Sequence, residues 1–121
     1  MTIANMANVA TINGFTKNGA VTTSQVDMLG GAVSSEYIYK INSIIIANID
    51  GTNAATVTIG VMTDGSNYHN IAHTVSVPAD ATLVAVDRNS SFYLDETDRL
   101  RIVGSANSDL TYLVSGEKIT D

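Results

Sequence analysis

Apolar and polar residues alternate along much of this chain with a period of two, the repeat of a β-strand that buries one face. The clearest stretch runs from Tyr37 to Thr63, where two apolar runs flank a polar segment at residues 50–53. The first run holds consecutive isoleucines at 44–46, and the second alternates small polar and apolar side chains from 56 to 61. Because the Asp-Gly-Thr-Asn segment between them favours a tight turn, we predict a central hairpin.

Further strands are predicted on both sides of this hairpin, separated by turn signals every eight to twelve residues or so. They are residues 6–12, 20–29, 67–77, 82–87, 99–103 and 110–115, with 116–121 as a polar tail. Pro78, the only proline, cannot donate to a ladder and is expected between strands. No window keeps apolar residues at helical spacing. The predicted fold class is therefore all-β: a single-domain antiparallel β-sandwich, jelly-roll-like, with an N-terminal arm.

The arm is predicted from charge. Residues 1–35 carry only Lys17 and Asp27 as charged residues. A largely uncharged segment of this length is an unusual surface for a free monomer. We therefore expect residues 1–35 to form an arm with short strands that packs on neighbouring subunits, and residues 36–121 to form the sandwich domain.

Composition narrows the classes of function. The chain has 121 residues, 12 acidic and 6 basic side chains and a net charge of −6, which disfavours nucleic acid and membrane surfaces as partners. It has no cysteine, so disulfides and thiolate metal sites are excluded. No apolar run approaches the roughly 18 residues of a membrane span, and the N-terminus lacks a secretory pattern. We expect the protein to be made and kept in a cytoplasm unless a larger assembly exports it.

Two groups of side chains could in principle hold metals. His69 and His73 are four residues apart, but on a strand that spacing separates them by roughly 13 Å, so we expect surface or interface histidines. The cluster Asp95, Glu96 and Asp98 could hold calcium, but its spacing matches no calcium loop, and a water-exposed turn is the preferred interpretation. Residues 64–67 are interpreted in the same way.

No catalytic motif is present: there is no G-x-S-x-G elbow, phosphate loop or dinucleotide fingerprint. We predict no enzyme activity, no cofactor, and no catalytic, cofactor-binding or metal-binding residues. Arg99 and Arg101 should share one strand face, with Arg88 near; we favour a solvated or salt-bridged face next to the Asp95 cluster over a docking patch for a partner.

Tyrosines offer one further possibility. Tyr37 and Tyr39 share a face, and either core packing or subunit contact is favoured by their isoleucine neighbours. With Tyr68 they could instead form a sugar-stacking platform. The absence of Trp and an aromatic content of 6% count against that alternative.

Four segments carry a family resemblance: YKINSIIIAN at 39–48, ATVTI at 55–59, VPADATL at 77–83 and FYLDETDRLRI at 92–102. Residues 37–121 resemble small all-β virion structural proteins of tailed bacteriophages, particularly phages of marine bacteria and cyanobacteria. The resemblance implies a non-enzymatic virion component with no active-site residues.

Within that family, the favoured function is a capsid decoration or cement protein that binds and stabilises the outer shell. The alternatives are a neck, tail or baseplate accessory protein and, from a different class, a carbohydrate-binding module. The implied partners are other virion proteins, either the major capsid protein or neck and tail proteins, together with further copies of the chain. The implied location is the virion, assembled in the host cytoplasm.

Overall fold

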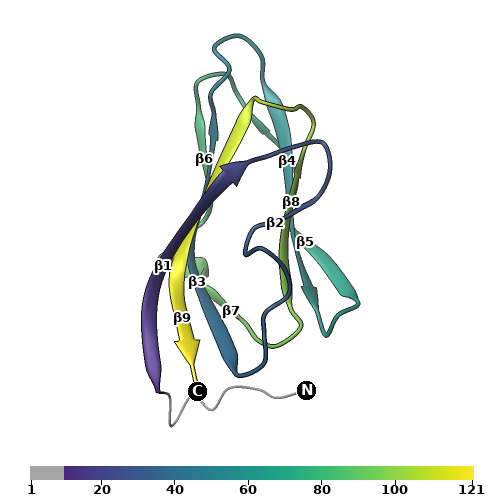
Figure 1. Ribbon diagram of the computed structural model, residues 1–121. Coiled ribbons are helices and arrows are strands. Elements are labelled where there is room, and N and C mark those ends of the chain that lie inside the picture. Colours follow the sequence, from purple (N-terminus) through teal and green to yellow (C-terminus); the bar gives the residue numbers. More distant parts are fainter. Residues whose placement is uncertain (1–9) are drawn as a thin grey trace.

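The computed structural model describes residues 10–121 and shows two packed antiparallel sheets (Figure 1). The strands are β1 (Thr11–Ala20), β2 (Val26–Asp27), β3 (Tyr37–Asn48), β4 (Ala55–Thr63), β5 (Asn67–Val77), β6 (Thr82–Val86), β7 (Phe92–Leu94), β8 (Arg99–Gly104) and β9 (Leu110–Thr120). A single-turn 3₁₀ helix, η2 (Arg88–Ser90), separates β6 from β7. The predicted all-β sandwich is confirmed. Residues 10–121 contain no helix that is long and apolar enough to span a membrane.

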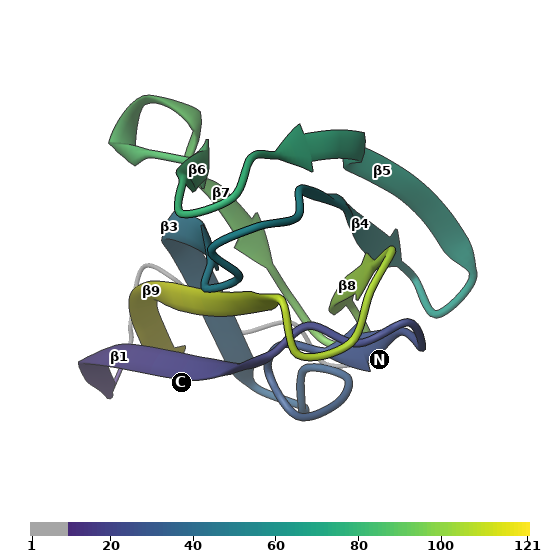
Figure 2. The ribbon, with the colours of Figure 1, turned by 90° about the horizontal axis from the view of Figure 1, so that it is seen from above.

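The two sheets are assembled from strands that are distant in sequence. Sheet A has the order β1-β9-β3-β6, and β7 also pairs with β3; sheet B has the order β2-β8-β4-β5. Figures 1 and 2 show sheet A on one side of the molecule and sheet B on the other. Each sheet therefore turns one face to the core and one outward.

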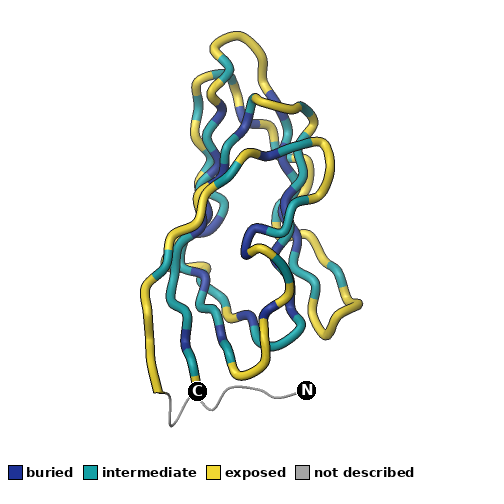
Figure 3. The backbone as a smooth tube through the Cα atoms, viewed as in Figure 1, coloured by how far each residue is buried: buried dark blue, intermediate teal, exposed yellow. Residues whose placement is uncertain are grey.

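The core lies between the sheets and follows the alternation in the sequence. Fully buried side chains come from both layers: Ile41, Ile44, Ile46, Leu110 and Val114 from sheet A, and Val57, Ile59, Leu100 and Ile102 from sheet B. Leu110, Tyr112 and Val114 share the inward face of β9, and Leu100 and Ile102 point inward from β8. Figure 3 shows these buried stretches on both layers and exposed residues at the turns.

The predicted central hairpin is wrong. β3 and β4 have the expected strand pattern, but β3 pairs with β6, β7 and β9, whereas β4 pairs with β5 and β8. The loop between them crosses from sheet A to sheet B. The buried Asn48 shapes this crossing, because its Nδ2 donates to the carbonyls of Asn53 (3.0 Å) and Val77 (2.9 Å) and its Oδ1 accepts from the Asp50 amide (2.9 Å). The same turn-forming residues can connect strands of two different sheets, so their presence does not specify a hairpin.

The predicted arm is also wrong for the described residues 10–35. β1 pairs with β9 of the same chain over its full length without a register shift. Val21, Met28, Leu29 and Val33 are buried in the core. The segment therefore belongs to its own sandwich, with residues 21–33 supplying core side chains and β1 forming a mostly exposed strand. Residues 1–9 of the predicted arm, including most of the predicted strand 6–12, lie outside the described residues.

The predicted polar tail is a strand. β9 continues to Thr120 between β1 and β3, and Ile119 is buried beside Ile38. Gly116 makes this continuation possible, because β3 bulges next to it and the Lys40 carbonyl occupies the space that a side chain at 116 would need. The predicted strand 82–87 is β6, which is an edge strand with Val84 exposed and so is not buried on both faces.

Candidate assembly surfaces

Three apolar side chains form a row on the outer face of sheet A. Ile45 of β3 pairs with Leu113 of β9 on one side and Val84 of β6 on the other. Their neighbours Ile44 and Val114 point into the core, so the three point outward. Leu113 is 37% exposed and Val84 56% exposed. Three apolar side chains in register on one face form a patch rather than scattered exposure. We call these three residues the apolar row.

The surroundings of the apolar row are uncharged. A shallow depression of about 420 Å³ beside it is lined by Asn18, Gly19, Ile45, Ala47, Thr111, Tyr112 and Leu113. The next pair along the outer face is Ser43 with Ser115. A partner that covered only the row and this depression would desolvate no charge, which keeps the cost of docking low.

The outer face of sheet B is polar and internally paired. Asp27 of β2 accepts from Arg99 Nη1 at 2.8 Å and from Arg101 Nε at 3.0 Å. Arg101 Nη1 also donates to Gln25 Oε1 at 3.3 Å, and Gln25 Nε2 donates to the Tyr68 hydroxyl at 3.1 Å. The chain of contacts therefore runs across all four strands of the sheet and ties its edges together.

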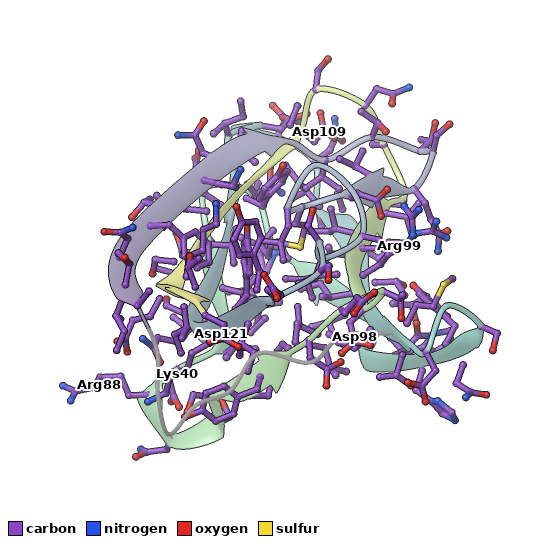
Figure 4. The ribbon with its side chains drawn as sticks, turned by 60° about the horizontal axis from the view of Figure 1, so that its bottom comes forward. Lys40, Arg88, Asp98, Arg99, Asp109 and Asp121 are labelled. Carbon is purple, nitrogen blue, oxygen red and sulfur yellow. The ribbon has the colours of Figure 1, made fainter. Side chains whose placement is uncertain are left out.

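This arrangement answers the sequence prediction for the arginines. Arg99 and Arg101 share a face, and that face is salt-bridged as favoured, with Asp27 as the carboxylate partner of both arginines. Arg88 lies in η2, on the opposite side of Figure 4 from Arg99, so the three do not meet. Because Arg99 and Arg101 are already paired, a docking patch built on them is not supported.

The acidic cluster is not the fully exposed turn that the sequence predicts. Asp98 is 5% exposed, and its carboxylate accepts from the backbone amides of Asp64 (3.2 Å) and Asp95 (3.0 Å). Asp98 therefore closes two loops onto each other. Desolvation, together with the nearby charges of Asp98 and Asp64, raises the pKa of Asp95. Among residues 10–121, no three His, Asp or Glu side chains are grouped so as to hold a metal ion.

Two other carboxylates meet at the loop between β3 and β4. The backbone amides of Thr52 and Asn53 donate to Asp50 and lower its pKa. Desolvation and the charge of Asp50 raise the pKa of Asp109. Burial also raises the pKa of Tyr112. These shifts follow from loop and core packing, and the residues present no reactive group to an enclosed cavity.

Both histidines are exposed on β5, in agreement with the surface interpretation. His73 Nδ1 lies 3.1 Å from Asn70 Nδ2, and the extended strand keeps His69 apart from it.

The three tyrosines do not form one platform. Tyr37 and Tyr39 pack against the core, Tyr39 with its ring centroid 5.3 Å from that of Phe15. Lys118 Nζ lies 4.3 Å from the Tyr37 ring. Tyr68 lies on β5, in the other sheet, and covers Gly60. Core packing, as predicted, accounts for Tyr37 and Tyr39.

The sequence does not reveal the apolar row before the register is known. The alternation in the sequence predicts that Val84 and Leu83 point in opposite directions. The adjacency of Val84, Ile45 and Leu113, however, depends on pairing between strands far apart in the chain.

No protein-family model matches this chain, and no curated protein does. Among solved structures, it is similar to a chain of Bacillus endospore appendages, described as a novel family of disulfide-linked pili. The identity is 16%, covering 98% of this chain and 88% of that chain, with a TM-score of 0.50. A chain of the VP2 subviral particle of infectious bursal disease virus is 11% identical, covering 92% of this chain and 33% of that chain, with a TM-score of 0.42. The first likeness shows a shared fold and nothing about function, and the second is too low to establish even the fold.

Proposed function

We propose that this chain is a structural component of a virion, and specifically a capsid decoration protein of a tailed phage that binds and stabilises the outer shell. The observation that carries the proposal is the apolar row on the outer face of sheet A, together with the uncharged depression beside it. The resemblance of residues 37–121 to small virion proteins supplies the class of assembly.

The face suits docking onto a preformed surface. Burying exposed apolar area contributes about 25 cal/mol per Å², and the row concentrates that area on three adjacent strands, β6, β3 and β9. A protein that binds only the assembled shell stabilises that shell by mass action. The net charge of −6 is compatible with an outer position, away from packaged DNA.

The polar groups that could perform chemistry serve the fold instead. Asp27 pairs two arginines, and Asp98 joins two loops. This use of the carboxylates supports a role without catalysis. Since the chain has no cysteine, its assembly would be non-covalent, unlike that of the disulfide-linked pili with which it shares a fold.

A neck, tail or baseplate accessory protein belongs to the same class and would dock onto its partner through the same apolar row. The carbohydrate-binding alternative gains nothing from the structure, because Tyr37, Tyr39 and Tyr68 are divided between two sheets and are engaged in packing.

Labelling of virions with an antibody against the protein tests the location. We expect label over the shell; label on the neck or tail would support the accessory role, and unlabelled virions would refute a virion component.

Co-pelleting with purified shells tests the surface. The double variant Val84→Ser with Leu113→Ser should bind shells about 5- to 150-fold more weakly, since about 1–3 kcal/mol of apolar burial is lost. The matched control is Ile71→Ser on β5 of sheet B, which is 47% exposed and should bind as the parent does. Equal loss in the control would contradict docking through sheet A.

A further inference from the structure

The four sheet edges of this sandwich differ in how open they are to another strand. In sheet B, β2 is two residues long, and β5 is irregular, with register shifts against β4 and a positive φ at Thr74. At the far edge of sheet A, β6 and β7 are short and η2 interrupts them. Short strands, bulges and interruptions are the usual protection against edge-to-edge pairing.

The fourth edge has none of these features. β1 is ten residues long, pairs with β9 in unbroken register, and contains no proline. Among residues 10–121 no strand pairs with its other side, and it is the outermost strand of sheet A in Figure 1. Its one charged residue, Lys17, lines a cleft of about 330 Å³ with Asp27, Met28 and Tyr112, so its side chain lies at the mouth between the sheets.

The register identifies which backbone groups of β1 are free. The Val21 amide donates to the Leu110 carbonyl at 2.9 Å, continuing the β1–β9 pairing. In an antiparallel pair, alternate residues direct both backbone groups to the same neighbour. Odd-numbered residues of β1 therefore face β9. The even-numbered residues direct their amides and carbonyls outward: Ile12, Gly14, Thr16, Asn18 and Ala20.

We propose that this edge is a self-association surface, on which β1 of a second copy of the chain adds in antiparallel fashion about a two-fold axis at Thr16. The proposal goes beyond the virion role, because it concerns the isolated protein and would hold whatever larger assembly it joins.

The symmetric register satisfies the free groups. Thr16 pairs with Thr16 of the second copy, Gly14 with Asn18, and Ile12 with Ala20. Five pairs that exchange two bonds each give about ten backbone hydrogen bonds. Lys17 then lies opposite Phe15 of the second copy, so like charges are not directly opposed. A register centred on Lys17 would oppose the two lysines.

The dimer would carry both docking faces on one side. A two-fold axis at an antiparallel strand pair is perpendicular to the sheet, so the outer faces of both copies of sheet A point the same way. Two apolar rows on one continuous sheet would engage a repeating shell bivalently, which raises avidity without new contacts.

A charge swap at the axis tests the proposal. Thr16 is exposed, so Thr16→Lys and Thr16→Glu should fold as the parent does, which circular dichroism and thermal melting would check. By sedimentation velocity and native mass spectrometry, we expect a dimer for the parent and a dimer at least about fivefold weaker for each variant alone, because like charges meet at the axis. An equimolar mixture of the two variants should restore a heterodimer.

The matched control is the same pair of substitutions at Thr82, which is exposed on β6 at the opposite edge of sheet A and should leave the dimer unchanged. A parent that stays monomeric at high micromolar concentration would overturn the proposal, as would a dimer insensitive to Thr16→Lys. Weakening without rescue in the mixture would overturn the symmetric register and indicate a different strand on this edge. The double variant Val84→Ser with Leu113→Ser should still dimerise, so failure of shell docking and failure of dimerisation can be told apart.

Discussion

The ring of Tyr68 on β5 lies directly over Gly60 of β4, so closely that a Cβ at position 60 would overlap the ring. The Tyr68 hydroxyl is thereby held where it accepts from Gln25 at 3.1 Å. Gly60 also pairs with Arg101, which donates to both Gln25 and Asp27. The missing side chain at 60 thus allows one aromatic ring to complete a polar network across sheet B.

Gly60→Ala should therefore destabilise the fold by about 1–3 kcal/mol, because Tyr68 must move and its hydrogen bond to Gln25 is lost. Urea unfolding would measure the change. Gly51→Ala is the control: a Cβ there would lie 3.7 Å from Asp80 Oδ2, an ordinary contact, so its midpoint should match that of the parent.

Aspartate substitutions on the two faces of β4 should have very different effects on folding. Ile59 is completely buried in a strand with partners on both sides, so Ile59→Asp should abolish folding, since an unpaired buried charge costs several kcal/mol against a total of about 5–15. Thr56→Asp, on the outward side of the same strand, should still melt cooperatively. A cooperative melt for Ile59→Asp near that of the parent would mean that the strand faces the other way.

Alternation predicts the faces of strands well and their partners poorly. The inward residues of β8 and β9 follow from local pattern, because a strand that buries one face repeats every two residues. Pairing depends on long-range register, so β3 and β4 appear as a hairpin although they belong to different sheets.

The predictions for the C-terminal end of β9 and for the N-terminal segment are wrong for a related reason. Only Ile119 is apolar among residues 116–121, and apart from its burial beside Ile38 the strand is held there by backbone pairing with β1 and β3. The apolar row is composed of residues from three strands, and no local window contains them together. The uncharged character of residues 10–35 is visible in the sequence, but burial in the chain's own core accounts only for Val21, Met28, Leu29 and Val33, because β1 is mostly exposed.

A chain that begins at residue 36 should not fold. It lacks β1 and β2, loses Val21 and Met28 from the core, and leaves Arg99 and Arg101 without Asp27. Circular dichroism and a thermal melt would show this directly. The single substitution Met28→Ala removes only one of these core side chains and should lower the free energy of unfolding by about 2–5 kcal/mol. A shortened chain with a cooperative melt would restore the prediction of a separable arm.

Stability should respond to acid through Asp95. Its pKa is raised in the folded state, so the folded protein binds this proton more readily than the unfolded chain, and ionised Asp95 destabilises the fold above its folded pKa. As the pH falls through the raised pKa, that destabilisation disappears.

Asp95→Asn should accordingly stabilise the protein at pH 7 by less than about 1 kcal/mol, with the gain shrinking as the pH is lowered toward 4. Urea titrations at several pH values would measure it. Glu117→Gln on β9 changes the net charge equally away from the cluster and should not reproduce the pH dependence. A gain from Asp95→Asn that is constant with pH would contradict this account.

The last prediction concerns the attachment of β2. This strand pairs with β8 over only two residues, Val26 and Asp27, and the Met28 amide adds one bond to the Leu100 carbonyl at 2.8 Å. The Asp27 side chain is about a quarter exposed and holds two arginines, so the ion pairs should secure the strand more than its short ladder does.

Asp27→Asn keeps the shape and removes the charge. It should cost about 1–2 kcal/mol of global stability and accelerate hydrogen exchange at the Met28 amide beyond that global effect, because β2 opens locally. The Ile46 amide in β3 should change only as global unfolding does. A double-mutant cycle with Arg101→Ala would give a coupling of at least about 0.5 kcal/mol if the contact is energetic. Equal exchange changes at Met28 and Ile46 would show that β2 is held by core packing of Met28 and that the ion pairs are incidental.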